Sequence, residues 1–94
     1  MNSKEALTIL ETELKPCVHL NNIQEIVFCK SWEWQTYQEI AETFCYNTDY
    51  IKEVGSHLWK FLSEKFGQRI TKSNFRSVIR RLAQQSQLDN RVIA

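Results

Sequence analysis

Basic side chains in the second half of the sequence have the spacing that a phosphate-contacting surface requires. Arg76 and Arg80 are four residues apart, so both would lie on one face of a helix. Such a face can neutralise the phosphates of nucleic acid or meet an acidic protein surface. The basic residues that would extend it are Lys60, Lys65, Arg69, Lys72 and Arg81. A solvated helix face without a ligand explains the same pattern equally well.

A second group of polar residues lies on the helix expected after Asn47. The apolar side of this helix is marked by Ile51, Val54 and Leu58, and the opposite side carries Thr48, Asp49, Lys52, Glu53 and Ser56. In a helix-turn-helix domain that side enters the major groove, where Lys52 can meet a phosphate or guanine and Thr48 a phosphate. Asp49 and Glu53 oppose this role, because carboxylates repel phosphates unless they accept a hydrogen bond from cytosine N4.

Residues capable of metal or nucleophilic chemistry are few and badly spaced. They are Cys17, His19, Cys29 and Cys45, and no Cys-x-x-Cys pair occurs among them. The sequence also contains no glycine-rich phosphate loop and no carboxylate pair in an obvious cleft. We therefore predict no metal, no cofactor and no enzymatic activity. Three widely spaced cysteines are typical of a reducing cytoplasm.

Length and composition favour one small all-α domain. A chain of 94 residues has room for a single core, and two Gly, one Pro and no alternating apolar run argue against a β fold. No apolar run approaches the roughly 20 residues of a membrane span. Residues 1–50 hold three Lys and eight acidic residues, whereas residues 51–94 hold nine Lys or Arg and three acidic residues. The two halves therefore carry net charges of about −5 and +6.

Hydrophobic periodicity predicts about five helices. They are expected at 4–14, 22–30, 37–44, 48–66 and from Thr71 to about Gln85, with the core at 20–85 and a frayed tail at 86–94. Thr36 and Glu39 have the spacing of a capping box, and Asn47 and Thr71 are expected to cap the helices that follow them. Gly67 would end the fourth helix, and 68–70 leaves room only for a minimal wing with one bridge pair.

Aromatic residues are numerous enough to stack nucleic acid bases, but we interpret most of them as core. They are Trp32, Trp34, Tyr37, Phe44, Trp59, Phe61, Phe66 and Phe75. Most fall on apolar helical faces that a small domain must bury. Trp34 is the exception, because it lies in the turn before a capped helix, where it could mark a contact with a partner.

Between residues 20 and 82 the sequence resembles the N-terminal helix-turn-helix domain of cyanobacterial multidomain signalling NTPases, including vWA-MoxR-associated proteins. The resemblance rests on Gln24, Trp32, Thr36-Tyr37-x-Glu39-Ile40-Ala41, Tyr46, Tyr50-Ile51-Lys52-x-Val54-Gly55, Leu58-Trp59, Leu62-Ser63, Gly67, Lys72 and Asn74-Phe75-Arg76. More loosely, 36–62 is similar to the tetrahelical helix-turn-helix of sigma factor region four and LuxR-type regulators. Trp34 replaces an expected glycine or polar turn residue. The downstream NTPase is absent, which favours an excised domain over a stand-alone relative.

Two functional hypotheses follow. The first is binding of double-stranded DNA by Thr48, Lys52, Ser56, Lys60, Lys72, Arg76 and Arg80. The second is a protein-interaction module that keeps the fold and uses its oppositely charged halves to bind itself or an attached NTPase or effector domain. Fold analogy favours the first, whereas the near-neutral charge and the acidic recognition helix favour the second.

Overall fold

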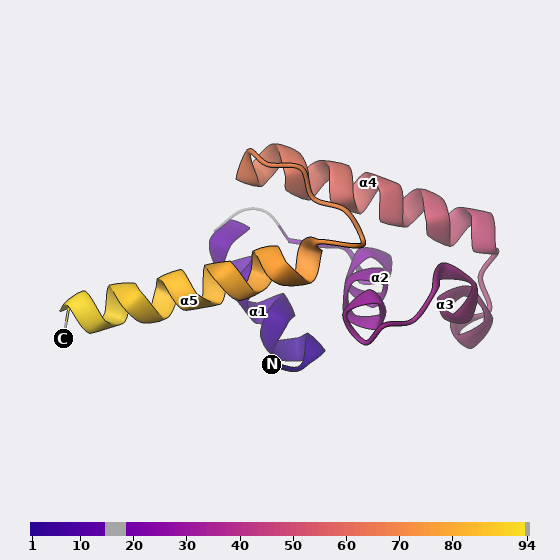
Figure 1. Cartoon of the computed structure of the whole chain (residues 1–94). Helices are drawn as coiled ribbons and strands as arrows, with labels where there is room; N and C mark the ends of the chain where they lie inside the picture. Colours follow the sequence, from indigo (N-terminus) through magenta and orange to yellow (C-terminus); the bar gives the residue numbers. More distant parts are fainter. Residues whose placement is uncertain (15–18, 94) are drawn as a thin grey trace.

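Five helices make up the computed structural model, which describes the backbone of residues 1–14 and 19–93 and the side chains of 1–14 and 19–85. They are α1 (Ser3–Leu14), α2 (Asn22–Trp32), α3 (Tyr37–Phe44), α4 (Thr48–Phe66) and α5 (Phe75–Ile93) (Figure 1). The described ranges contain no strand or bridge, so the all-α fold is confirmed and the minimal wing is wrong. None of the described helices is long and apolar enough to cross a membrane.

The third and fourth helices have the predicted bounds, whereas α5 differs at both ends. Thr71 does not cap α5, which begins only at Phe75. The side-chain oxygen of Asn74 accepts from the Thr71 N–H at 2.7 Å, and its amide group donates to the Arg69 carbonyl at 2.9 Å. Asn74 therefore holds a separate turn before the helix. The helix then continues to Ile93, beyond its predicted end, while fraying of its last residues stays a prediction.

The loop between α4 and α5 is held by a side chain instead of a β pairing. The Ser63 hydroxyl accepts from the Ile70 N–H at 2.8 Å and lies 3.2 Å from the Ile70 carbonyl oxygen. This fixes the loop against the last turns of α4. Gly67 ends α4 in the left-handed region with φ 63°, as predicted.

The core is centred on the aromatic ring of Phe75. Its centroid lies 5.4 Å from that of Phe28, 5.9 Å from that of Trp32 and 4.6 Å from that of Trp59. Phe75 is fully buried, and both tryptophans are nearly so, which confirms their assignment to the core. Such a site loses about 3–5 kcal/mol when Phe is truncated to Ala.

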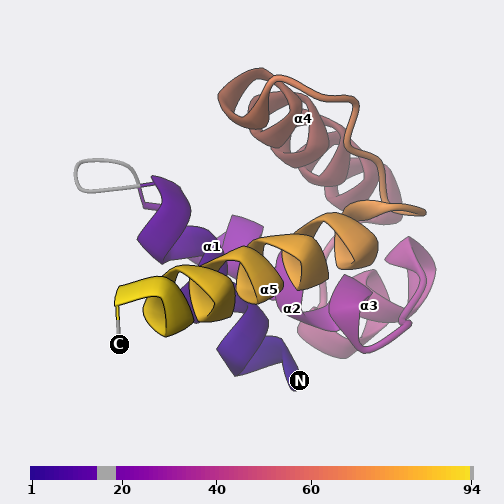
Figure 2. The same cartoon turned by 60° about the vertical axis from the view of Figure 1, so that its left-hand side comes forward.

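The other four helices form two pairs that pack on either side of α2. One pair is α3 with α4, and on the other side α1 packs against both α2 and α5, as the two views show (Figures 1 and 2). Ala6 and Leu10 of α1 are fully buried. The core therefore begins before residue 20, the predicted limit.

Candidate helix-turn-helix interface

The helix pair α3–α4 begins with the predicted capping box. The Glu39 N–H donates to the Thr36 hydroxyl at 3.1 Å, and the Thr36 N–H donates to the Glu39 carboxylate at 2.9 Å. The bond from the Thr36 backbone, followed by that from its side chain, lowers the pKa of Glu39. Glu39 is therefore a fixed negative charge at the start of α3.

The turn between α3 and α4 is built from residues with turn-forming backbones. Cys45 adopts the left-handed conformation with φ 60°, and the Tyr46 N–H donates to the Ala41 carbonyl at 2.9 Å. Asn47 caps α4 as predicted, accepting from the N–H groups of Asp49 at 2.8 Å and Tyr50 at 3.4 Å. Two of the N–H groups that could have held a phosphate are thus already occupied.

Gly55 lets α3 approach α4 closely. A Cβ atom at Gly55 would lie 2.6 Å from the Tyr37 hydroxyl oxygen and 2.7 Å from a ring carbon. That hydroxyl also accepts from the Trp59 indole N–H at 2.8 Å, so the Tyr37 ring is held in place. Ala41 of α3 is buried as well. Sequence reasoning missed the role of Gly55, although a glycine inside a helix indicates a packing reason.

The outer side of the helix pair is predominantly acidic. We define the α3–α4 surface as the exposed charged and tyrosine side chains of α3, of the turn that follows it and of α4 before Gly55. They are Glu39, Glu42, Tyr46, Asp49, Tyr50, Lys52 and Glu53. This surface holds four carboxylates and one lysine. Of the other predicted groove residues, Ser56 is exposed and Thr48 is half-buried.

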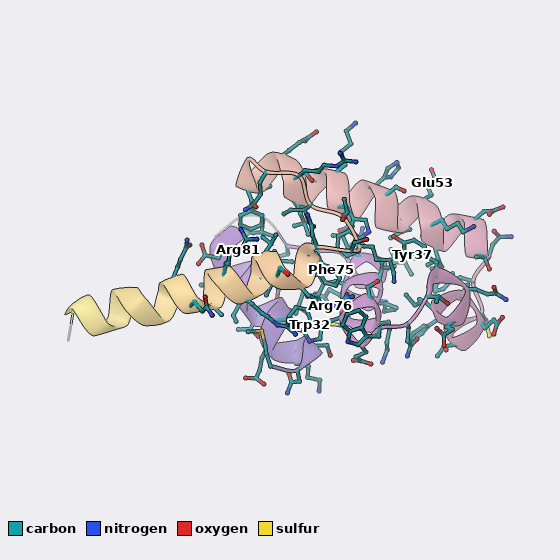
Figure 3. The ribbon with its side chains drawn as sticks, viewed as in Figure 1. Trp32, Tyr37, Glu53, Phe75, Arg76 and Arg81 are labelled. Carbon is teal, nitrogen blue, oxygen red and sulfur yellow. The ribbon has the colours of Figure 1, made fainter. Side chains whose placement is uncertain are left out.

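Two exposed tyrosines form part of this surface, and sequence reasoning did not single them out. Tyr46 is 41% and Tyr50 44% exposed, and their ring centroids are 5.6 Å apart. Tyr46 lies in the turn before α4 and Tyr50 in the first turn of α4, so helical periodicity did not indicate the pair. Asp49 and Glu53 are near them in sequence, and Figure 3 shows Glu53 on the outer side of α4.

Arg76 does not belong to an exposed basic face. It is only 8% exposed, its guanidinium donates to the Ser31 carbonyl at 3.2 Å, and its Cζ lies 3.4 Å from the centroid of the Trp34 ring. Desolvation, followed by the charge of Arg80, lowers its pKa. The prediction that Arg76 presents its charge to phosphate beside Arg80 is therefore wrong, because Arg76 fastens α5 to the α2–α3 turn (Figure 3).

Lys72 is also committed within the chain. Its ammonium donates to the Gln35 carbonyl at 3.0 Å and lies 5.4 Å from the centroid of the Tyr37 ring. Burial is the main cause that lowers its pKa. Lys72 is therefore half-buried and has fewer donors for an external phosphate.

Five basic side chains remain exposed between residues 57 and 85. We call them the α4–α5 basic surface, and they are Lys60, Lys65, Arg69, Arg80 and Arg81. Two lie near aromatic rings, with the Lys65 ammonium 5.7 Å from Phe61 and the Arg80 guanidinium 5.8 Å from Trp32. Glu64 is the one exposed carboxylate among them.

The cysteines provide no sign of a metal centre within the described residues. Cys29 is half-buried, its thiol donates to the Ser3 carbonyl at 3.9 Å, and burial raises its pKa. Cys45 is exposed, and Cys17 lies outside the described residues. No group of three His, Cys, Asp or Glu residues able to hold a metal occurs in the part of the chain that is described.

Comparison with known protein families is consistent with this architecture. The family model described as vWA-MoxR associated protein N-terminal HTH matches residues 1–82. The match includes α1, so it extends beyond the resemblance noted over 20–82. Searches of curated proteins and of solved structures found no significant match. The chain belongs to the family of vWA-MoxR associated protein N-terminal helix-turn-helix domains.

Proposed function

We propose that this domain is a regulatory protein-interaction module that keeps the helix-turn-helix fold and binds a basic protein surface through its α3–α4 surface. The observation that carries the proposal is the charge of that surface, which holds four exposed carboxylates and Lys52 as its only exposed cation.

Electrostatics argues against duplex DNA as the ligand of this surface. DNA carries one negative charge per roughly 1.7 Å of its axis, so each carboxylate brought to it is repelled. Glu39 stays ionised because its pKa is lowered by the capping box. Asn47 occupies N–H groups at the α4 N-terminus. Arg76 and Lys72, two of the predicted phosphate ligands, are bound inside the domain.

The exposed tyrosines support a protein partner. Tyrosine is enriched at the centre of protein interfaces, since it buries a large rigid area and keeps a hydroxyl for hydrogen bonding. Tyr46 and Tyr50 offer such a centre, with Asp49 and Glu53 as an acidic rim. Lysine or arginine from a partner could lie on these rings and pair with the rim.

The partner can be another region of the same longer chain. The resemblance of the sequence to the N-terminal domains of signalling NTPases implies NTPase or effector domains downstream. A basic surface on such a domain would suit the α3–α4 surface. In that arrangement the module would report its occupancy to the attached domain through a protein contact.

DNA binding is the second candidate, and exposed Lys52, Ser56 and Lys60 along α4 favour it. Under this candidate, Lys52 and Ser56 would enter the groove while Lys60 and Arg80 contact phosphates. The number of exposed cations is small, so binding would be weak and strongly dependent on salt.

Two titrations separate the candidates. In the first, fluorescence anisotropy with mixed-sequence duplex DNA at about 50 mM salt should show no binding. The test is sensitive, because even non-specific protein–DNA contacts are strong at this salt concentration. In the second, a lysine-rich peptide should shift the NMR signals of Tyr46 and Tyr50, and a neutral peptide of equal length should not. Glu53→Lys should abolish these shifts, whereas Glu13→Lys on α1, with the same charge change, should keep them. Salt-sensitive DNA binding lost in Lys52→Ala, together with no response to the peptide, would overturn the proposal.

A further inference from the structure

We propose that the α4–α5 basic surface of a second copy of this chain docks on the α3–α4 surface, so that copies associate head to tail. This inference rests on the proposed function and names its partner. The tyrosine pair and its acidic rim form one half of the contact, and the α4–α5 basic surface forms the other.

The two surfaces occupy opposite parts of one rigid element. Tyr50 and Lys65 are both on α4, and fifteen residues of helix separate them by roughly 22 Å. Glu53 and Lys60 are nearer, at roughly 10 Å along the same helix, but no ion pair joins them in the described structure. The rigid helix therefore keeps the two surfaces from closing on one another within a single copy. In Figure 3, Glu53 lies on the outer side of α4 and Arg81 lies on α5, on the other side of the view.

Among the described residues, no ion pair involves either surface, and the one internal counter-charge is the half-buried Lys72, which attracts Glu39. In the part of the structure that is described, the ion pairs join His19 to Glu11 and Lys30 to Glu33. None of these residues belongs to α3, α4 or α5. The carboxylates beside the tyrosines and the cations beyond Gly55 thus face solvent, and they are complementary in sign.

The chemistry of the contact matches on both sides. The tyrosine rings present π faces to incoming ammonium or guanidinium groups, while Asp49 and Glu53 supply carboxylates for the same cations. Glu64 lies among the cations and can meet Lys52, the one exposed cation of the α3–α4 surface. The one carboxylate of the basic surface and the one lysine of the acidic surface are therefore also complementary in charge.

Such a contact has a predictable form of assembly. Because the two docking surfaces differ, the interface is heterologous, and each added copy leaves one free surface at either end. The assembly should grow beyond a dimer, or close into a ring, as concentration rises. Salt should weaken it, since its exposed charges are screened over about 10 Å at 0.1 M.

Sedimentation velocity of the full 94-residue chain tests the inference. The mean mass should rise with concentration at about 20 mM salt, and association should be at least tenfold weaker at about 300 mM salt. The acidic-side variant is Asp49→Lys with Glu53→Lys, and the basic-side variant is Lys60→Glu with Arg81→Glu. Each should be monomeric alone, and mixing the two should restore association, because one native interface then forms.

The controls keep the outcome unambiguous. Glu5→Lys with Glu13→Lys makes the same charge change on α1 and should associate like the unaltered chain. Circular dichroism verifies that every variant is helical. A chain that stays monomeric at all concentrations, or a mixture that does not associate, would overturn the inference. If the lysine-rich peptide still shifts the NMR signals of Tyr46 and Tyr50 in that case, the proposed function survives without self-association. If the peptide causes no shift and the chain does not associate, both the proposed function and the inference are wrong.

Discussion

The turns before and after α3 share one backbone conformation but differ in the contacts that stabilise it. Each places a residue other than glycine in the left-handed region, Trp34 with φ 70° and Cys45 with φ 60°. Trp34 is 72% exposed, yet its ring is stacked by Arg76 from the distant helix α5. At Cys45 the support is local, because the Cys45 and Tyr46 N–H groups both donate to the Ala41 carbonyl. Both turns have backbone hydrogen bonds of their own, and the first is supported by tertiary structure in addition.

The α3–α4 pair is instead fixed away from its turn. The close approach of Tyr37 to Gly55, with the hydroxyl of Tyr37 bound to Trp59, joins the first turn of α3 to the middle of α4. A helix-turn-helix unit can thus tolerate a turn without tertiary contacts when side chains join its two helices at another point. The contrast can be tested by removing each support separately.

Removal of Arg76 should have the largest effect. Arg76→Ala removes the charged donor to the Ser31 carbonyl, which keeps only the Trp34 N–H and the other backbone donor of its turn, and it removes the cation stacked on the Trp34 ring. We therefore expect a loss of about 2–3 kcal/mol in the free energy of unfolding. Urea denaturation followed by circular dichroism measures it. The exposed Arg81→Ala is the matched control and should change the free energy by less than about 0.5 kcal/mol. Equal effects for both variants would show that the first turn needs no tertiary support.

Filling the contact at Gly55 should have the next largest effect. In Gly55→Ala the added Cβ would displace the Tyr37 ring and break its bond to Trp59. A cost of about 2–3 kcal/mol is reduced by the roughly 1 kcal/mol that Ala contributes to helix propensity. A net loss of about 1–2 kcal/mol, with a change in Trp59 fluorescence, is expected. Ser56→Ala, one position along the same helix, should be nearly neutral, and a stabilising Gly55→Ala would contradict the contact.

Glycine should have different effects in the two turns. Cys45→Gly should stabilise the domain by about 0.5–1 kcal/mol, because glycine adopts the left-handed conformation without the steric cost of a Cβ. Trp34→Gly relieves the same cost but loses the stack on Arg76, so it should be neutral or destabilising. In the Arg76→Ala background, Trp34→Gly should become stabilising. A double-mutant cycle measures this coupling, and additivity would refute it.

The smallest effect should be a pH dependence confined to the start of α3. The pKa of Glu39 is lowered in the folded state, so its contribution is present above the unfolded pKa and is lost as pH falls through the folded pKa. Glu39→Gln keeps a hydrogen-bonding side chain without a titrating group. The stability difference between the two proteins should therefore change in the acidic range and stay constant above it. Asn47 caps α4 without a titrating group, so Asn47→Ser should leave that pH profile unchanged.

Local signals explain why α3 and α4 could be predicted and other features could not. The Thr36 box, the Asn47 cap and Gly67 each act within a few residues, so sequence alone reveals them. Arg76 and Ser31 are separated by 45 positions, and no periodicity indicates that an arginine on a helix face will turn inward. The start of α5 likewise depends on tertiary structure. Asn74 binds the Thr71 N–H and the Arg69 carbonyl in the loop that follows α4, so the helix begins after Asn74 and not at Thr71. The candidate surface was half foreseen, since Asp49 and Glu53 were recognised and the tyrosines were not.

The contact between Trp34 and Arg76 also has a consequence for how such domains diversify. A left-handed turn residue with a large ring is tolerated while an arginine supports it, and that arginine is retained while the ring needs support. The two positions should therefore change together across related sequences, with glycine at the turn accompanied by a freer choice at position 76. A lineage that altered position 76 before position 34 would pass through a less stable domain.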